Sequence, residues 1–352
     1  MDGFFFKEGF SHTFVKLIVS QLKLSEKNIV LDPFVGVGTT CLACREVGIP
    51  SVGVEVSPLF QFIADVKIQD YNIALLRSLR DRILGERFQP QKYVVQPFLK
   101  KLFPKPVLED IFFFKKVLQT VGDEKYRRFF TLALITAAEK SSYIYRDGAV
   151  VKAVRDKPRI PSLRKALRRV CNMMIKDVEA MPLKNVTAEV RLGDARDLSF
   201  LEDETIDAVI TSPPYLNKIE YTKCYWPEYE LFFSGEGHPS MRSYIGVRPR
   251  EVNYSEYSED LPPAAFLYFE DMERALAEIN RVLKPGGKGV MVVGGGVFPD
   301  KVVETDVETA KIAEEVGLTV DRIVAVNKRA ATARRIVKIG ETRESIIYFS
   351  KR

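Results

Sequence analysis

The sequence predicts an α/β protein built on a doubly wound, mostly parallel sheet. Short apolar segments alternate with amphipathic helical segments along the chain, as in repeated strand–helix–strand units. The first two strand candidates, 29–32 and 51–56, are apolar enough to be covered on both faces, which is typical of parallel strands. A glycine-rich turn follows the first candidate and leads into a helical pattern. These three observations together favour the doubly wound fold.

The later elements continue this alternation. A long amphipathic helix follows the fourth strand candidate, and a turn at K284-P-G-G precedes the next strand. The expected positions are strands at 187–192, 206–211, 288–293, 319–326 and 345–350, and helices at 266–283 and 305–315.

The spacing of the strands predicts an insertion. Well over a hundred residues separate the second and third strand candidates, whereas connections in α/β units are short. We therefore expect an inserted basic helical subdomain at 71–182, and a catalytic domain formed by 1–70 and 183–352. A second insertion, 216–263, is rich in Tyr, Pro and Gly, and we expect irregular structure over the sheet edge there. The helical patterns in the first insertion cover 72–84, 107–118, 128–140 and 162–170.

Composition indicates an ordinary soluble globular protein, with 46% hydrophobic and 28% charged residues among 352. The net charge of +6 is a mild basic excess, so only its distribution could indicate a polyanionic partner. No apolar run is long enough to span a membrane, and the amino terminus lacks a signal-peptide pattern. The cysteines form no disulfide framework, which favours a reducing cytoplasm. They are Cys41, Cys44, Cys171 and Cys224.

Cys41 and Cys44 form a CxxC pair, but a zinc site is not expected. The chain has no second pair, and its only histidines are His12 and His238. We expect the pair to be two small residues on the first turns of a helix.

The ends of the predicted strands indicate an adenosine ligand. In open α/β sheets, ligands bind outside the carboxyl ends of the strands. Gly36 and Gly38 follow the first strand and allow the backbone to approach a ligand closely. The chain has no phosphate-binding P-loop motif, and the third glycine of a dinucleotide motif is missing. Glu55 is placed to accept hydrogen bonds from ribose hydroxyls, and Asp194 from an adenine amino group.

The same segments resemble a known family, the S-adenosylmethionine-dependent amino methyltransferases that act on exocyclic nitrogens of nucleic-acid bases. D32-P-F-V-G-V-G-T-T is similar to the family's first motif, G53-V-E-V-S-P to the second and S212-P-P-Y to the fourth. F10-S-H-T-F-V-K-L-I resembles the segment that closes over the methionine part of the cofactor. The resemblance implies a Rossmann-like class I methyltransferase fold with S-adenosylmethionine as cofactor. The implied cofactor-binding residues are Phe10, Ser11, Asp32, Pro33, Phe34, Gly36, Gly38, Thr39, Thr40, Glu55, Val56, Asp194, Ala195 and Ser212.

S212-P-P-Y is suited to hold a base edge. An exocyclic amino group is a poor nucleophile, and acceptors such as the Ser212 hydroxyl and the Pro213 carbonyl favour a more tetrahedral nitrogen. Two prolines hold such acceptors in place beforehand, and Tyr215 can stack on a flipped base. The expected catalytic residues are therefore Ser212, Pro213, Pro214 and Tyr215, without a metal or a covalent nucleophile. A rigid turn at a strand end is the structural alternative.

In the resembling family, S-P-P-Y goes mainly with N4 of cytosine, and that base is the expected target. The segment 152–169 holds eight basic residues and one acid, which could neutralise phosphates or form a solvated helix face. A further basic patch lies near Arg334. The expected nucleic-acid-binding residues are Arg159, Arg164, Lys165, Arg168, Arg169, Tyr225 and Trp226; for Trp226 a packing role is an equal alternative.

Two departures from the family argue against a DNA substrate, and the second of them, together with the basic helical insertion, favours structured RNA such as ribosomal RNA. S-P-P-Y follows the cofactor motifs, whereas it precedes them in many serine-type DNA enzymes, and no separate reader of DNA sequence is visible. DNA N4-cytosine or N6-adenine methylation is the alternative. A cofactor-binding regulator and a protein-amide methyltransferase also remain open, although the latter enzymes carry Asn in place of Ser212.

Overall fold

The computed structural model describes residues 11–147, 150–154, 160–216, 224–234, 262–298, 301–333 and 337–352. The chain forms two compact units. The helical unit comprises Met1–Lys7, Asp65–Leu183 and Glu220–His238. The sheet unit comprises Glu8–Ala64, Lys184–Ile219 and Pro239–Arg352. Neither Phe10 nor Arg159 belongs to the described residues, so these two predictions cannot be placed.

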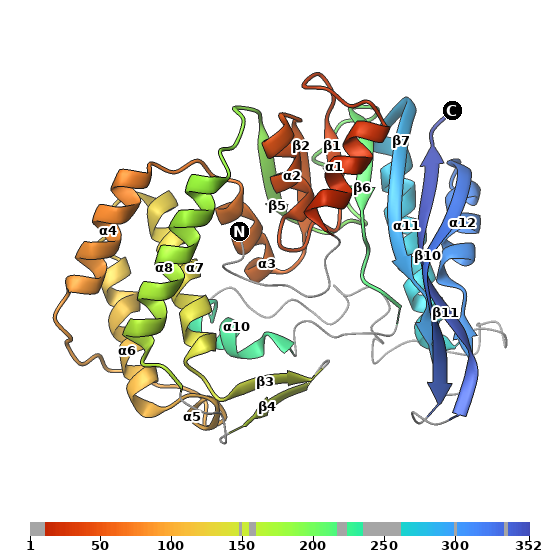
Figure 1. Ribbon diagram of the computed structural model, residues 1–352. Helices are drawn as coiled ribbons and strands as arrows, with labels where there is room; N and C mark the ends of the chain where they lie inside the picture. Colours follow the sequence, from red (N-terminus) through yellow and green to blue (C-terminus); the bar gives the residue numbers. More distant parts are fainter. Residues whose placement is uncertain are drawn as a thin grey trace. The chain divides into compact units, whose positions relative to one another are not determined.

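The sheet unit contains a seven-stranded sheet in the order β10-β11-β7-β6-β1-β2-β5 (Figure 1). The five strands from β7 to β5 pair in parallel, and β11 is antiparallel to both of its neighbours. The predicted doubly wound, mostly parallel sheet is confirmed. The strands are β1 (Val30–Asp32), β2 (Ser51–Glu55), β5 (Ala188–Leu192), β6 (Ile206–Thr211), β7 (Leu283–Gly294), β10 (Thr319–Ala333) and β11 (Val337–Ser350).

Two strand predictions differ from the structure. β7 begins at Leu283, so the predicted turn at 284–287 lies inside a strand. The ladder to β6 shifts register there, between the pairs Ile206–Leu283 and Ala208–Lys288, which accommodates the turn residues as an irregularity. β10 and β11 are also longer than expected. β10 continues past residue 326 to Ala333, and β11 begins at Val337 and not at residue 345.

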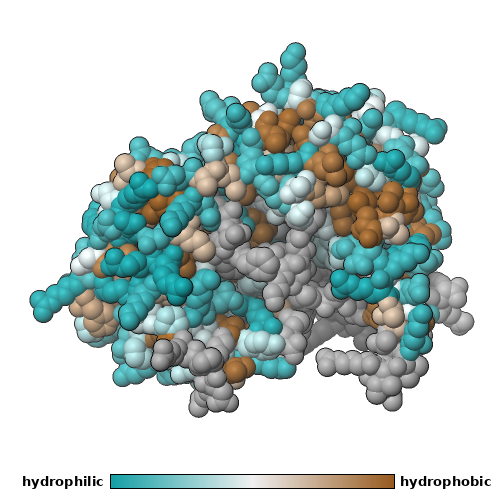
Figure 2. Space-filling view, viewed as in Figure 1, coloured by the Kyte–Doolittle hydropathy of each residue, from teal (hydrophilic) through white to brown (hydrophobic). Residues whose placement is uncertain are grey.

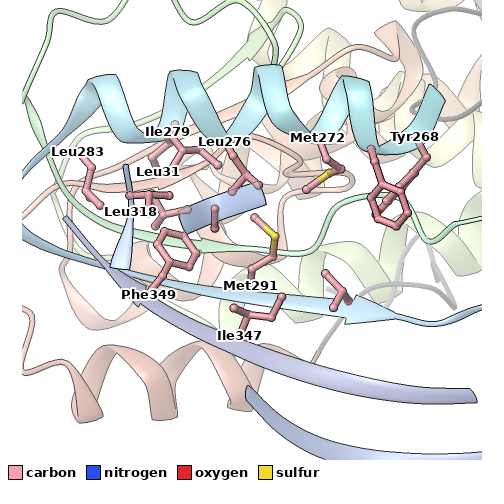
Figure 3. Close-up of a cluster of buried hydrophobic side chains, with 14 of the residues drawn as sticks. Leu31, Tyr268, Met272, Leu276, Ile279, Leu283, Met291, Leu318, Ile347 and Phe349 are labelled. Carbon is pink, nitrogen blue, oxygen red and sulfur yellow. The ribbon is translucent and has the colours of Figure 1, made fainter. Parts of the chain in front are cut away.

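One hydrophobic core of the sheet unit lies between the sheet and helix α11 (Pro263–Val282) (Figure 3). A second buried cluster includes Ile18, Ala43 and Ile210. Tyr268, Met272, Leu276 and Ile279 follow the i, i+4, i+8, i+11 pattern of one helix face. They point toward strand residues that include Phe349 (Figure 3). The other helices of this unit are α1 (His12–Gln21), α2 (Thr39–Val47) and α12 (Thr305–Glu315), and α3 (Pro58–Lys67) crosses the boundary between the two units. A two-stranded sheet of β8 (Gly296–Val297) and β9 (Val302–Val303) completes the unit.

The helical unit buries the apolar faces of its helices against one another. On α8 (Leu163–Ala180), buried Leu163, Ala166, Leu167 and Val170 lie on one face at helical spacing. The other elements are α4 (Ile73–Gly85), α5 (Leu99–Leu102), α6 (Lys105–Leu118), α7 (Glu124–Lys140), the hairpin β3 (Ile144–Asp147)–β4 (Val150–Ala153), and α10 (Trp226–Phe232). Helix α10 corrects the expectation of irregular structure in that part of 216–263: it starts with Pro at N1/N2 and buries Tyr229 and Leu231.

Hydrophilic side chains cover much of the described surface in the view of Figure 2, with hydrophobic groups between them. None of the helices that the structure describes is long and apolar enough to cross a membrane.

Candidate active site

Asp32 lies at the carboxyl end of β1 and is 2% exposed. Its two carboxylate oxygens accept from two hydroxyls, Thr40 Oγ1 at 2.5 Å and Thr211 Oγ1 at 2.6 Å. The Phe34 N–H donates to the same group at 3.1 Å. Burial raises the pKa of Asp32 to about 6, although the three donors oppose that rise. The carboxylate therefore links the glycine loop, α2 and the end of β6 inside the protein, and its predicted contact with a cofactor stays a prediction.

The glycine loop lies between β1 and α2. Gly36 and Gly38 both have positive φ, +53° and +86°, a conformation that favours glycine. A Cβ on Gly38 would come within 2.9 Å of the Ala64 backbone, whereas a Cβ on Gly36 would meet nothing within 4 Å. Gly38 is therefore required by packing, and Gly36 borders open space that a ligand can fill.

Glu55 ends β2 beside this loop. Its carboxylate accepts from Gly36 N at 3.0 Å and from Ser57 N at 2.9 Å. Burial raises its pKa to about 7, and these N–H donors work in the opposite direction. A carboxylate has about four acceptor positions, so Glu55 keeps capacity for the ribose hydroxyls that the sequence predicts as its partners.

Asp194 follows β5, and Arg196 binds its carboxylate. Arg196 Nε donates to Oδ1 at 2.9 Å and an Nη to Oδ2 at 2.6 Å, while the other Nη reaches Asp271 at 2.6 Å. Asp271 is 8% exposed on α11. Gly193, one residue earlier, donates its N–H to the Glu55 carbonyl, so Asp194 and Glu55 lie at neighbouring strand ends. The predicted adenine acceptor is thus already oriented by an arginine, which sequence reasoning did not find.

S212-P-P-Y follows directly after Thr211, the last residue of β6. Ser212, Pro214 and Tyr215 are partly buried and Pro213 is buried. The Tyr215 hydroxyl donates to Glu344 of β11, and its ring packs on Gly294, where a Cβ would come within 2.5 Å of the ring. The Tyr215 side chain is therefore held at one end by Glu344 and on one side by the end of β7.

The other predicted cofactor residues lie around these strand ends. Pro33 and Phe34 continue from Asp32, Thr39 and Thr40 begin α2, and Val56 and Ala195 follow Glu55 and Asp194. Ser11 acts as the N-cap of α1, where its hydroxyl accepts from Phe14 N at 3.1 Å. The structure therefore brings the motifs of β1, β2, β5 and β6 to one edge of the sheet, and their contact with a cofactor stays a prediction.

The nucleic-acid-binding predictions fall on α8 and α10 in the helical unit. Lys165, Arg168 and Arg169 are exposed on α8. Arg164 differs, because its guanidinium donates to the carbonyls of Leu84 and Glu86 and lies 5.0 Å from the Phe114 ring centre. Its contacts are those of a residue that supports the helical packing.

Tyr225 and Trp226 also make contacts within the helical unit. Tyr225 is 8% exposed, with the Arg146 guanidinium 4.8 Å from its ring centre. Arg146 pairs in turn with Glu139 and Glu228. Trp226 meets Phe98 edge to face at 5.4 Å, which favours the packing alternative for this residue.

Cys41 and Cys44 are buried on α2, and burial raises the pKa of both thiols, that of Cys44 to about 12. Cys41 Sγ lies beneath Gly53 of β2, where an added Cβ would approach it to 3.0 Å. Close packing of α2 on β2 accounts for the pair. Within the described ranges, no group of three or more His, Cys, Asp and Glu side chains could hold a metal ion.

Comparison with known proteins agrees with this arrangement of motifs. Residues 6–65, which contain the glycine loop and Glu55, match the DNA methylase family N6_N4_Mtase. The chain is a distant relative of the S-adenosylmethionine-dependent N6/N4 DNA methylases. The type II methyltransferase M.BsoBI of Geobacillus stearothermophilus is 23% identical over 98% of this chain and 84% of its own length. M.AvaI of Nostoc sp. is 23% identical over 92% of this chain and 80% of its own length.

Among solved structures, a SAM-dependent methyltransferase from Methanosarcina mazei aligns with 95% of this chain and 96% of its own, at 10% identity and a TM-score of 0.37. The relationship to the N6/N4 methylases therefore rests on the sequence matches, and the fold on the strand order and directions of this chain. S-adenosylmethionine is the cofactor of this methylase family.

Four residues of the site escaped the sequence analysis: Thr211, Arg196, Gly294 and Glu344. Arg196 stands two residues after Asp194, a spacing at which a side chain can return to its neighbour. Thr211 directly precedes S212-P-P-Y, and Gly294 begins a run of three glycines. These were available signals, whereas Glu344 has no local signal because its partner is 129 residues away in the chain.

Proposed function

We propose that the protein transfers the methyl group of S-adenosylmethionine to the exocyclic amino group of a base in DNA. The observation that carries this proposal is the hydrogen bond from Thr211 to Asp32. Thr211 directly precedes S212-P-P-Y, which we call the base motif, and Asp32 directly precedes the glycine loop. A single buried contact therefore joins the two motifs whose combination the amino methyltransferases share.

The residues at the strand ends fit S-adenosylmethionine. Gly36 borders open space, Glu55 retains acceptor capacity for ribose hydroxyls, and Asp194 is oriented beside it to accept from the adenine amino group. When bound, the cofactor supplies an electrophilic methyl group on a sulfonium centre. The acidic side chains also suit its positive charge, since an opposite charge favours the ionised form of a carboxylate.

We assign the base to S212-P-P-Y. The Ser212 hydroxyl and the Pro213 carbonyl accept hydrogen bonds from the amino group and favour a more tetrahedral nitrogen. The two prolines hold these acceptors before the base arrives, so little reorganisation is needed. Because Gly294 lies against one side of the Tyr215 ring, the base would stack on the opposite face.

Cytosine N4 is the proposed target, on the strength of serine at the first position of the motif. The matches to a DNA methylase family and to type II methyltransferases favour DNA, and none of them supports the RNA substrate favoured by the sequence analysis. N6 of adenine is the second candidate, because the matching family includes both N6 and N4 methylases.

Expression in a bacterial host without amino-methylated cytosine tests this proposal. DNA and RNA from cells that express the wild type or Ser212→Ala are digested to nucleosides and compared by mass spectrometry. N4-methyldeoxycytidine in DNA, present with the wild type and strongly reduced with the variant, is the expected result. N6-methyldeoxyadenosine would overturn the base assignment, and a methylated ribonucleoside without DNA methylation would overturn the DNA assignment.

A further inference from the structure

The β10–β11 hairpin extends past the carboxyl end of the sheet. β7 ends at Gly294, which pairs with Glu344 of β11. β11 begins seven residues earlier, at Val337, and the strand that those residues pair with is β10. Near the root, Gly295 N also donates to the Arg343 carbonyl, and Val302 of β9 lies against Gly340. At about 3.3 Å per residue, the two-stranded ribbon projects roughly 20 Å beyond β7. Figure 1 shows this ribbon continuing past the strand ends of the sheet unit.

The root of the hairpin is joined to the base motif. Glu344, the last β11 residue that pairs with β7, accepts the hydrogen bond of the Tyr215 hydroxyl. Gly294, its partner across the ladder, lies against the Tyr215 ring. A base held by S212-P-P-Y would therefore be next to the point where the ribbon leaves the sheet.

The described part of the ribbon carries exposed positive charge. Lys328, Arg329 and Lys338 are exposed, and Lys338 pairs with Glu341. Among the residues that the structure describes, neither Lys328 nor Arg329 has an ion-pair partner. Since successive strand residues point to opposite faces, these two place charge on both faces of the ribbon. Ala330, the next residue along β10, is also exposed and adds little bulk, whereas Ala331 is buried.

One cross-strand pair in the ribbon places two positive charges opposite each other. Lys328 lies directly opposite Arg343, and like charges at such positions destabilise a sheet. Arg343 is compensated by Asp306, to which Nε donates at 2.6 Å. Lys328 is left with its charge directed to solvent, which an external polyanion would compensate.

We propose that the hairpin contacts the sugar–phosphate backbone of duplex DNA beside the target base, an inference that rests on the proposed function. A two-stranded ribbon fits the major groove of B-DNA. Lys328 and Arg329 neutralise phosphates, and the small exposed side chain of Ala330 permits close approach. Such contacts position the duplex and do not by themselves read its sequence.

Charge reversal with a matched control tests the inference. Lys328→Glu/Arg329→Glu is compared with Lys27→Glu/Lys288→Glu, which makes the same change at two other exposed residues, Lys27 ahead of β1 and Lys288 in β7 opposite Ala208. Duplex DNA binding is measured between 50 and 200 mM salt, and cofactor affinity by calorimetry. Loss of two phosphate contacts lowers the slope of log K against log salt by about 1.8. Between 50 and 200 mM salt, the fold-loss of DNA affinity should then be about tenfold smaller for the hairpin variant than for the wild type.

The expected outcome is weaker DNA binding and a smaller slope in the hairpin variant alone, with cofactor affinity unchanged in both variants. An unchanged slope in the hairpin variant, or an equal fall in both variants, would overturn the inference while wild-type methylation of DNA still stands. A wild type that binds cofactor but neither binds nor methylates duplex DNA would overturn the DNA substrate, and this inference with it.

Discussion

Thr211 Oγ1 donates a hydrogen bond to Asp32 Oδ1 at 2.6 Å, between the last residues of β6 and β1. The other oxygen of Asp32 accepts from Thr40 on the first turn of α2. One carboxylate thereby contacts the start of the base motif and the start of the helix behind the glycine loop. We interpret Asp32 as a positioning residue that holds the two motifs in register.

Substitution of each threonine by valine should separate these two contacts. Both hydroxyls are buried, and valine preserves the shape, so each change removes one hydrogen bond, worth about 1–3 kcal/mol to a charged acceptor. Thr211→Val should lower kcat roughly tenfold at near-normal cofactor affinity, whereas Thr40→Val should mainly weaken cofactor binding. Steady-state kinetics and calorimetry measure both effects.

Thr211→Ser retains the hydroxyl and is the control for this pair, with kcat expected near the wild-type value. Equal effects of both valine variants on kcat and cofactor affinity would show that Asp32 is only a stabilising contact of the fold.

The buried acids predict how stability depends on pH. The folded-state pKa of Asp32 is about 6 and that of Glu55 about 7, both above their ordinary values. Groups with raised pKa contribute stability that is fully present below about pH 4 and is lost as pH rises through about 6 to 7. For Asp32 the contribution is on the order of 2–3 kcal/mol.

Denaturant unfolding of the wild type and Asp32→Asn at pH 5 and pH 8 measures this contribution. The asparagine variant should lose less stability than the wild type between the two pH values. Identical losses would show that Asp32 is not protonated in the folded protein over this range.

The two loop glycines should respond differently to substitution. Gly36→Val meets no neighbour within 4 Å but fills the space assigned to the cofactor, and its positive φ adds about 1–3 kcal/mol of strain. The variant should remain folded and lose cofactor binding. Gly38→Ala brings a Cβ within 2.9 Å of the Ala64 backbone, so its main effect should be lower thermal stability. Circular dichroism and calorimetry separate the two, and normal cofactor affinity in Gly36→Val would contradict the cofactor placement.

The basic residues of α8 should also differ in their response to charge reversal. Arg164→Glu removes the bonds to the Leu84 and Glu86 carbonyls, so it should destabilise the helical unit. Lys165→Glu/Arg168→Glu/Arg169→Glu changes exposed residues only, so it should leave the melting temperature nearly unchanged and weaken nucleic-acid binding. Full nucleic-acid affinity in the triple variant would favour the solvated-face interpretation of this segment.

The sequence was sufficient for those parts of the site that depend on local pattern. D32-P-F-V-G-V-G-T-T predicts a strand, a tight turn and a helix, and all three occur at these residues. The position of S212-P-P-Y after a buried strand is also confirmed. Each conclusion needs only hydrophobic pattern and turn chemistry over a few neighbouring residues.

Contacts between distant residues could not be predicted in this manner. The Asp32–Thr211 bond depends on the register of β1 against β6, which pairs Val30 with Ala208. Arg164 looked like a surface charge because its carbonyl partners lie about 80 residues away in the sequence, at Leu84 and Glu86. The Arg146 guanidinium over the Tyr225 ring likewise joins residues that are far apart in the sequence.

The central claim is that the residues around Asp32 and S212-P-P-Y form one site for methyl transfer to a DNA base. Purified protein is mixed in stoichiometric amounts with duplex DNA and S-adenosylmethionine that carries a labelled methyl group, and the DNA is then digested to nucleosides. The account predicts that the label is recovered as N4-methyldeoxycytidine from the wild type, with a much slower reaction for Thr211→Val. Absence of label from every DNA nucleoside, with a protein that binds the cofactor, would contradict the claim.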